Sequence, residues 1–272
     1  GELIEAKKKT SLRRFHNTVL GEAYIDDSIA LSEDMVRAAM GQQLGWHYNG
    51  QQVFLGIDVG QNCHVVMGTW NRTDGWNVFH WQVVPATQLE EHVKALLAEY
   101  KIVGGAIDRH PCTPTAVAVR ALSEGKIIPV EYRGLTEVNV KENELTPEEG
   151  YAQVNKTQLL DDVARAIRQK EMIFTNYGKD QSMIIEHMMD NVRHEEEGEK
   201  AVWKKQTGND HYFHAIAFML ASTKLADFII ANDKNDVRTL VMANNVDIKK
   251  RSNDNLGSNT GDNRIWRQTH LL

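Results

Sequence analysis

The sequence predicts an α/β fold in which a mixed β-sheet carries helices on both faces. Three apolar, strand-like runs come first, over residues 51–60, 64–70 and 76–84, and the polar break at residues 71–75 is typical of a hairpin turn. Helix-like and strand-like segments then alternate along the chain, which is the pattern of parallel βαβ units. We therefore expect three antiparallel strands that continue into a parallel part of the same sheet.

The later elements follow from periodicity and from end signals. Leu89, Val93 and Leu96 fall on one helical stripe. A second helical segment has Pro114 in its first turn and Gly125 at its end. Helices are expected over residues 87–100, 113–125, 157–170 and 179–197, and from Asn209 or Asp210 onward. Strands are expected over residues 101–108, 126–134 and 171–178, with an extended segment at 200–206.

Composition along the chain predicts three regions. Residues 1–45 are irregular apart from a short helix capped by Ser32, and we interpret them as a linker or packing arm. Residues 46–232 hold the predicted sheet and helices. Residues 233–272 are rich in Asn, Asp, Ser and Gly, which predicts a polar tail with little core of its own. Within the globular region, residues 134–156 are polar and without clear periodicity, so a long loop or hairpin excursion is expected there.

Composition also bounds the class of protein. The chain has 272 residues, 42% of them hydrophobic, which is enough for one sizeable core. Its mean hydropathy is −0.45, and no apolar run approaches the roughly 18 residues of a membrane span. Two cysteines do not make a disulfide scaffold and suit a reducing compartment. The net charge of −6 argues against tight autonomous binding to nucleic acid, but an acidic metal site contributes to that charge, so a nuclease remains compatible.

Three carboxylates stand at apolar, structured segments. Asp58 lies near the end of the first strand-like run, Asp108 ends the fourth, and Asp210 opens an apolar helix. Two such charges about 4 Å apart repel by roughly 4 kcal/mol at an effective dielectric near 20, and divalent metal ions turn such a cluster into a site for cutting phosphodiesters. Each residue also has a local explanation, as a turn aspartate beside Gly60, an ion pair with Arg109 and a helix N-cap respectively.

The order of these carboxylates resembles that of the ribonuclease H-like superfamily. Within it, the local sequence resembles the nuclease domain of the large terminase subunit, the DNA-packaging motor of tailed bacteriophages. The matching segments are FHNTVLGEAY at residues 15–24, FLGIDVG at 54–60, GAIDRH at 105–110, VNKTQLLDDVARAI at 154–167 and NDHYFHAIAFML at 209–220. The ordered set is more specific than any one motif, because IDVG also occurs in sugar kinases.

This resemblance implies a metal-dependent endonuclease that cuts double-stranded DNA during viral genome packaging. Asp58, Asp108 and Asp210 would be the catalytic residues and the ligands of two Mg²⁺ or Mn²⁺ ions, with Asp58 bridging the pair. One ion would activate the attacking water and the other would stabilise the leaving 3′ oxygen. The implied partners are double-stranded DNA, a P-loop ATPase domain, the portal and the small terminase subunit, with no membrane. The implied location is the host-cell cytoplasm.

The chain departs from a complete terminase in one respect. Such a protein has an N-terminal ATPase domain with a P-loop, and no G-x-x-x-x-G-K-[ST] occurs here. We expect a nuclease domain without ATP hydrolysis, in which residues 1–45 are a remnant of the interdomain linker. A packaging nuclease must also be restrained while DNA moves, so the excursion at residues 134–156 is expected to border the groove and limit DNA entry.

Two other functions stay open from the sequence. The first is a non-catalytic DNA-binding or docking module that kept the fold and lost the chemistry, which a plasmid-nicking assay with and without Mn²⁺ distinguishes. The second is an actin-like sugar kinase, because IDVG can begin a phosphate-binding hairpin. A kinase would need a second glycine-rich phosphate loop, which the sequence lacks, and nucleotide binding would distinguish it.

Histidines and basic residues near the motifs have competing interpretations. His214 lies one turn after Asp210 and is expected to pack beside it rather than bind metal. His211 is expected to be exposed, with contact to phosphate or metal as the alternative. A zinc site is disfavoured because the candidate ligands lack the usual C-x₂₋₄-C spacing; they are Cys63, His64, His110 and Cys112. Five basic residues could lie beside a DNA-binding groove, but the sequence does not distinguish them from ordinary surface charges. They are Arg109, Arg133, Lys156, Lys204 and Lys205.

Overall fold

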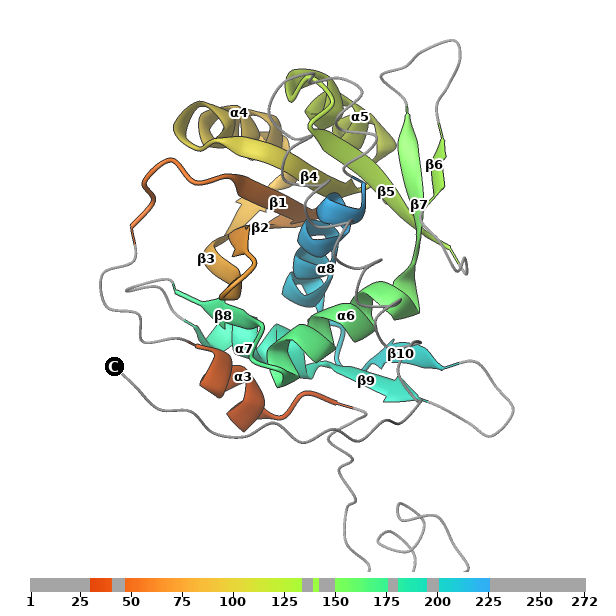
Figure 1. Ribbon diagram of the computed structural model, residues 1–272. Coiled ribbons are helices and arrows are strands. Elements are labelled where there is room, and N and C mark those ends of the chain that lie inside the picture. The colour runs from red at the N-terminus through yellow and green to blue at the C-terminus, as the bar shows by residue number, and fades with distance from the viewer. Residues whose placement is uncertain are drawn as a thin grey trace, which may run out of the picture. The chain divides into compact units, whose positions relative to one another are not determined.

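The computed structural model describes residues 30–40, 47–133, 139–141, 150–175, 181–194 and 201–225. Eight strands in this part of the chain form one sheet in the order β6-β7-β5-β4-β1-β2-β3-β8 (Figure 1). They are β1 (Val53–Asp58), β2 (Asn62–Asn71), β3 (Gly75–Pro85), β4 (Ile102–Asp108), β5 (Ile127–Arg133), β6 (Asn139–Lys141), β7 (Tyr151–Asn155) and β8 (Met172–Phe174). The predicted fold class, a mixed sheet with helices on both faces, is confirmed.

The antiparallel and parallel parts of the sheet meet at β1. This strand pairs antiparallel with β2, which pairs antiparallel with β3 across the predicted hairpin at residues 71–75. On its other side β1 pairs in parallel with β4, and the parallel ladder continues through β5 to β7. The carboxyl end of β1 therefore lies where the direction of pairing changes. Open α/β sheets commonly bind their ligands beyond the carboxyl ends of strands at such a point.

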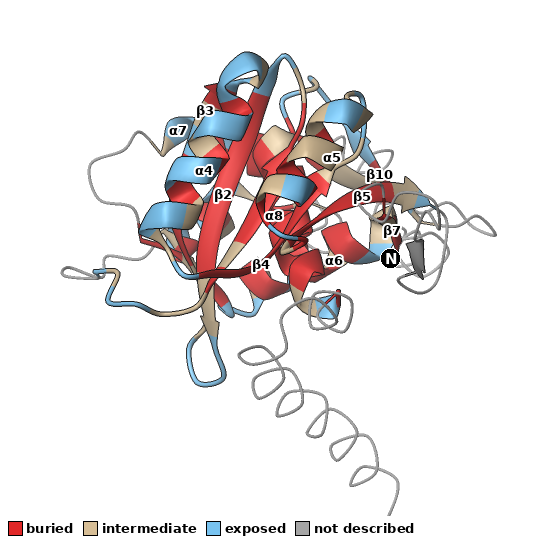
Figure 2. Ribbon diagram, turned by 90° about the horizontal axis from the view of Figure 1, so that it is seen from above, coloured by how far each residue is buried: buried red, intermediate tan, exposed pale blue. Residues whose placement is uncertain are grey.

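Helices cover both faces of the sheet (Figures 1 and 2). One face carries α3 (Glu33–Ala39), α6 (Lys156–Arg168), α7 (Ser182–Met189) and α8 (His211–Lys224), and the other carries α4 (Leu89–Glu99) and α5 (Thr113–Leu122) after a short 3₁₀ turn at Ala86–Gln88. Side chains of β1 alternate between the two: Leu55 and Ile57 pack with the α4–α5 core, whereas Phe54 packs with the α8 core. By the same alternation, Gly56 and Asp58 face α8.

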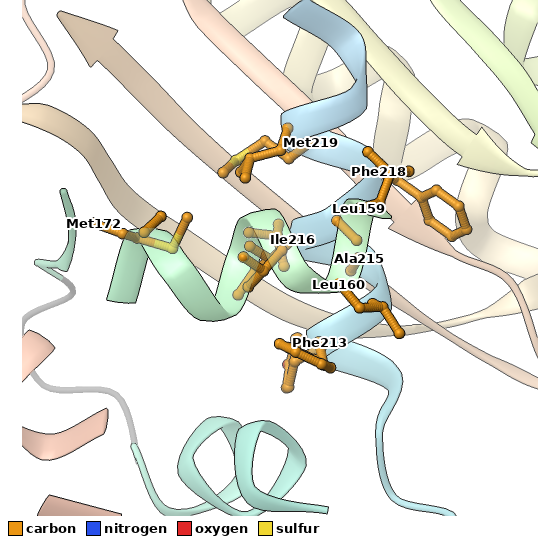
Figure 3. Close-up of a cluster of buried hydrophobic side chains, with 14 of the residues drawn as sticks. Leu159, Leu160, Met172, Phe213, Ala215, Ile216, Phe218 and Met219 are labelled. Atoms are coloured by element: carbon orange, nitrogen blue, oxygen red, sulfur yellow. The ribbon is translucent and has the colours of Figure 1, made fainter. Parts of the chain in front are cut away.

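Helix α8 lies very close to the sheet because two strands present glycine beneath it. A Cβ added to Gly56 would lie 1.9 Å from the Ala215 carbonyl oxygen and 2.5 Å from the Met219 amide nitrogen. A Cβ on Gly68 would lie 2.9 Å from the Met219 sulfur. On its other sides α8 is packed by α6 and α7, so most of its side chains are buried and the helix is not amphipathic. The side chains in this cluster include Leu159, Leu160, Met172, Phe213, Ile216 and Phe218 (Figure 3).

Two elements differ from the sequence prediction. Residues 151–155, expected within the polar excursion, form the core strand β7, in which Ala152 and Val154 are fully buried. The helix expected over residues 179–197 ends at Met189. The next residues form β9 (Asn191–His194), which pairs with β10 (Val202–Lys205) in a separate two-stranded sheet. Both strands are short, and each is defined by pairing with a distant segment rather than by its own hydrophobic period.

Part of the N-terminal region packs into the core. The Ser32 hydroxyl accepts a hydrogen bond from the Met35 amide at 3.3 Å, which is the predicted N-cap of α3. The side chains of Val36 and Ala39 are buried against the α6–α7 side of the molecule. Residues 1–29, 134–138, 142–149 and 226–272 lie outside the described residues, so the predicted domain boundaries, the gating excursion and the polar tail stay predictions. None of the helices in the described ranges is long and apolar enough to cross a membrane.

Candidate metal centre

Asp58 and Asp108 end neighbouring parallel strands at matching positions. Ile57 of β1 is aligned with Ile107 of β4, so the next residue on each strand, Asp58 and Asp108, points to the same face of the sheet. Asp58 is 7% exposed, and Asp108 is half-buried. Because the charge of Asp58 contributes to a raised pKa at Asp108, the two carboxylates lie within electrostatic range of each other.

Asp210 stands at the start of α8. It is the N-cap residue of this helix and is 4% exposed. The loop before it is held by Asp190, whose carboxylate accepts hydrogen bonds from the Thr207 amide and hydroxyl, both at 2.7 Å, and from the Gly208 amide at 2.9 Å. Burial alone would raise the pKa of Asp190, but these bonds outweigh it and lower the pKa. The ionised Asp190 therefore fixes the loop that positions Asp210.

A hydrogen-bonded chain links β5 to the N-terminus of α8. The His214 Nε2 atom lies 2.9 Å from Asp210 Oδ2, and its Nδ1 atom lies 2.8 Å from the Tyr132 hydroxyl. Burial raises the pKa of Tyr132, and the charges of all three aspartates raise it further. The hydroxyl therefore stays protonated and donates to Nδ1, while the Nε2–H group donates to the Asp210 carboxylate. The charges of Asp58, Asp108 and Asp210 therefore all act on one tyrosine hydroxyl.

The local environments divide the carboxylates electrostatically. Burial alone would raise the pKa of Asp210, but the hydrogen bond from His214 acts against burial and helps to hold the pKa well below its ordinary value. Asp108 accepts a hydrogen bond from the His110 amide at 3.0 Å. Burial, with repulsion from Asp58, raises the pKa of Asp108 to about 7. Asp58 and Asp108 repel each other, and Asp210 stays ionised. A cation bound among these carboxylates would therefore lower the electrostatic free energy of the site.

Replacing Asp108 with asparagine is expected to stabilise the metal-free protein. A carboxyl group whose folded-state pKa is raised to about 7 stabilises the fold most below about pH 4, and that contribution is lost as pH rises through about 7. At about 1.4 kcal/mol per pKa unit, Asp108→Asn should raise the free energy of unfolding above pH 7 by roughly 2–4 kcal/mol. Denaturant unfolding in chelator across this pH range measures the gain. A difference between parent and variant that does not grow with pH would contradict the assignment.

Histidines complete the surroundings of Asp58. The Asp58 Oδ2 atom lies 2.8 Å from His211 Nδ1, and this contact raises the pKa of His211. His64 is directly opposite Asp58 in the β1–β2 pairing and is 6% exposed. Burial and the charges of His211 and His187 lower the pKa of His64 to about 3, although the Asn62 carbonyl acts in the opposite direction. One ligand atom from each of Asp58, His64 and His211 lies within 4.8 Å of the other two.

These residues fit a divalent cation. The three aspartates supply the hard oxygen ligands that Mg²⁺ and Mn²⁺ prefer. His64 supplies a neutral imidazole whose buried Nδ1 atom makes no hydrogen bond within the described residues, and buried polar atoms are normally paired. The cluster lies at the carboxyl ends of β1 and β4.

The histidine predictions have mixed outcomes. The packed position expected for His214 beside Asp210 is confirmed. The exposure expected for His211 is wrong in part, because its side chain is 40% exposed and is bound to Asp58. The disfavoured zinc set is not brought together: Cys63 packs in the α4–α5 core, whereas its neighbour His64 faces α8. The approach of His64 to Asp58 was missed from sequence, although a hairpin centred on Gln61 places the two residues opposite each other.

Arginines lie beside the carboxylates at the same edge of the sheet. Glu131 of β5 is 2% exposed and accepts hydrogen bonds from Arg109 at 2.7 Å, Arg133 at 2.8 Å and Gln153 at 2.7 Å. Burial alone would raise the pKa of Glu131, but the bonds from its three donors lower it to about 2. The Arg109 guanidinium also lies 4.0 Å from the centre of the Tyr151 ring. Glu131 therefore holds two partly exposed cations at the carboxyl end of β5.

Comparison with solved structures gives matches to bacteriophage large terminases. The large terminase of one thermophilic bacteriophage, in complex with ATP-γ-S, is 13% identical over 81% of this chain and 51% of its own, with a TM-score of 0.47. The large terminase nuclease of the thermophilic phage G20c is 13% identical over 72% of this chain and 98% of its own, with a TM-score of 0.46. The HK97 bacteriophage large terminase is 9% identical over 80% of this chain and 49% of its own, with a TM-score of 0.46.

Asp58 ends β1, Asp108 ends β4 and Asp210 caps α8, which is the chain order of the carboxylates in the superfamily that the sequence resembles. The strand order and the helices on both faces are consistent with the ribonuclease H-like fold class that the sequence predicts. These three solved structures are two large terminases and one terminase nuclease. The chain spans about half the length of these two large terminases. No protein-family model and no curated protein matches it.

Proposed function

We propose that this protein is a divalent-metal-dependent endonuclease that cuts double-stranded DNA. The observation that supports the proposal is that Asp58 of β1, Asp108 of β4 and Asp210 at the start of α8 all lie within electrostatic range of Tyr132. Buried carboxylates are costly unless they are compensated, and a purely structural role explains poorly why Asp108 is kept where its pKa rises to about 7. Metal ligation accounts for the shared position of all three.

The three aspartates would hold Mg²⁺ or Mn²⁺, with Asp58 between the other two. When bound, such ions activate water and stabilise the charge that develops on a phosphodiester. The rest of the chain orients the ligands. His214 fixes the Asp210 carboxylate through Nε2, and Tyr132 fixes the His214 ring through Nδ1. Oriented ligands of this kind keep a metal site preorganised, and their partners typically matter about 10–100-fold for metal affinity or activity.

Arg109 and Arg133 are suited to hold the DNA backbone beside this centre. Both bind Glu131, yet their side chains remain 26% and 57% exposed respectively, so guanidinium donors are left for phosphate oxygens. Lys156 lies on the other side of β5, with Nζ 5.6 Å from the Tyr132 ring centre. Contacts of this kind position DNA without reading its sequence. They also compensate locally for the chain's overall net charge of −6.

We further propose that the cutting serves viral genome packaging. The support is the ordered set of terminase-like motifs, from FLGIDVG at residues 54–60 to NDHYFHAIAFML at residues 209–220. The implied partners are a P-loop ATPase domain, the portal and the small terminase subunit, and the implied place of action is the host cytoplasm. The rival kinase requires a second glycine-rich phosphate loop, which this sequence lacks.

A plasmid-cutting assay tests the nuclease proposal. Purified protein is expected to nick or linearise supercoiled plasmid with Mn²⁺ or Mg²⁺ and to be inactive in excess chelator, with activity restored when metal is added back. A parallel reaction with Arg109→Ala should need more protein for the same rate, because a phosphate contact is lost. Undiminished cutting in chelator would contradict the metal-dependent mechanism. Absence of cutting with every divalent metal would favour the non-catalytic DNA-binding module.

A further inference from the structure

Three histidines from three elements pack against one another, and two of them, His64 and His211, lie beside Asp58. His64 comes from β2, His187 from α7 and His211 from the first turn of α8. The rings of His64 and His211 are stacked, with centroids 4.6 Å apart and planes inclined by 10°. The His187 ring centroid lies 5.2 Å from that of His64 and 5.8 Å from that of His211. A site that binds only hard cations through carboxylates does not require imidazole ligands.

The hydrogen bonds divide the three histidines into two kinds. His187 Nδ1 accepts the Tyr212 amide hydrogen at 3.2 Å, so this ring already supports the start of α8. His64 Nδ1 is buried and makes no hydrogen bond within the described residues. His211 donates from Nδ1 to the ionised Asp58 carboxylate, which leaves a lone pair on Nε2 in the neutral tautomer. His64 and His211 are therefore the two rings with nitrogen ligands to offer.

We propose that Asp58, His64 and His211 form a nitrogen-rich metal position that binds a borderline divalent ion, of the Zn²⁺ and Co²⁺ class, more tightly than Mg²⁺. Their ligand atoms already lie within 4.8 Å of one another. Imidazole nitrogen suits Zn²⁺ and Co²⁺, whereas a site made only of carboxylates suits Mg²⁺ and Mn²⁺. Asp58 belongs to both donor sets, so the inference rests on the proposed function for its biological meaning, although the binding itself requires no DNA.

Binding requires one ring to turn. Lone pairs of imidazole lie in the ring plane, and two stacked rings inclined by 10° do not direct them to a common point. His211 is the ring that moves, because its side chain is 40% exposed, whereas His64 is held in the core at 6% exposure. On binding, the ion would separate the stacked rings of His64 and His211, and each ring would donate one nitrogen to it. For His64 this would be the nitrogen that is otherwise unpaired. The protein's preference among metals is then set by His64 and His211, beyond what the three aspartates provide.

The alternative is that the histidines are only packing groups under the start of α8. Metal titration of the full chain, stripped of metal by chelator, separates the two. Co²⁺ should give visible d–d absorption of a nitrogen-ligated ion that saturates, and calorimetry should show Zn²⁺ binding that equal Mg²⁺ does not displace. His64→Gln and His211→Gln should each weaken Co²⁺ and Zn²⁺ affinity by about tenfold or more. The surface variant His47→Gln is the matched control and should bind like the parent.

Each outcome bears on the inference independently of the nuclease proposal. Asp108→Asn should keep the Co²⁺ absorption while losing cleavage, because Asp108 is outside this donor set. Absent cleavage in the parent would overturn the proposed function but not the metal position. Parent-like Co²⁺ affinity in folded His64→Gln, judged by circular dichroism, would overturn the inference. If His64→Gln does not fold, His211→Gln decides, because its partly exposed position tolerates substitution. Equal affinity of the parent for Mg²⁺ and Zn²⁺ would also overturn it.

Discussion

Asp58→Asn is expected to reduce DNA cleavage by on the order of 10³-fold or more while leaving the fold intact. Asparagine keeps the shape of the side chain and can still accept the hydrogen bond from His211 Nδ1, which lies 2.8 Å from Oδ2 in the parent. It removes the charge that two metal ions would share. The rate of plasmid cutting with Mn²⁺ and the calorimetric affinity for Mn²⁺ should therefore fall together. In chelator the melting temperature should stay the same or rise, because repulsion with Asp108 is relieved.

The same result is expected for Asp108→Asn and Asp210→Asn, since each removes one oxygen ligand of the proposed centre. The matched control is Glu90→Gln, which removes one negative charge from the exposed surface of α4 and should cut like the parent. Loss of cleavage without loss of Mn²⁺ affinity in Asp58→Asn would separate metal binding from catalysis at this residue. A parent-like rate in any one of the three aspartate variants would show that its residue is misassigned.

The sheet was predictable because its signals are local. Strand alternation and the hairpin at residues 71–75 define β1 to β3, and the apolar run ending at Asp108 defines β4. Parallel neighbours place their carboxyl ends at one edge, so the approach of Asp58 to Asp108 follows from sequence once the βαβ pattern is recognised. Asp210 was a candidate from the sequence because it directly precedes an apolar, helix-like segment.

The elements that escaped prediction depend on distant partners. Strand β7 has five residues and is a strand because it pairs in parallel with β5 and packs Ala152 and Val154 into the α8 core. Strand β9 follows α7 directly, and its pairing with β10 is not signalled by composition. The bond between His211 and Asp58 joins residues 153 positions apart and depends on how closely α8 approaches the sheet. No local sequence pattern predicts how closely α8 approaches the sheet, although glycine at positions 56 and 68 permits the close contact.

Gly56→Ala is expected to be the most damaging conservative substitution in the core. The new methyl group would lie 1.9 Å from the Ala215 carbonyl oxygen and 2.5 Å from the Met219 amide nitrogen. Both are backbone atoms of α8, so the whole helix must move away from β1. We expect a loss of about 3 kcal/mol or more in the free energy of unfolding, at the upper end of the usual cost of overpacking. Denaturant unfolding at constant pH measures it.

The displacement should also reach the metal centre, because α8 carries Asp210 at its N-terminus and His211 in its first turn. Gly56→Ala should therefore lose cleavage even under conditions where the variant stays folded. The matched control is Gly105→Ala, whose methyl group would lie 3.1 Å from Ile127 and Leu55 on the opposite side of the sheet. It should cost less stability and keep both cleavage and Mn²⁺ affinity. Equal effects of the two substitutions on cleavage would mean that the close contact between β1 and α8 does not position Asp210.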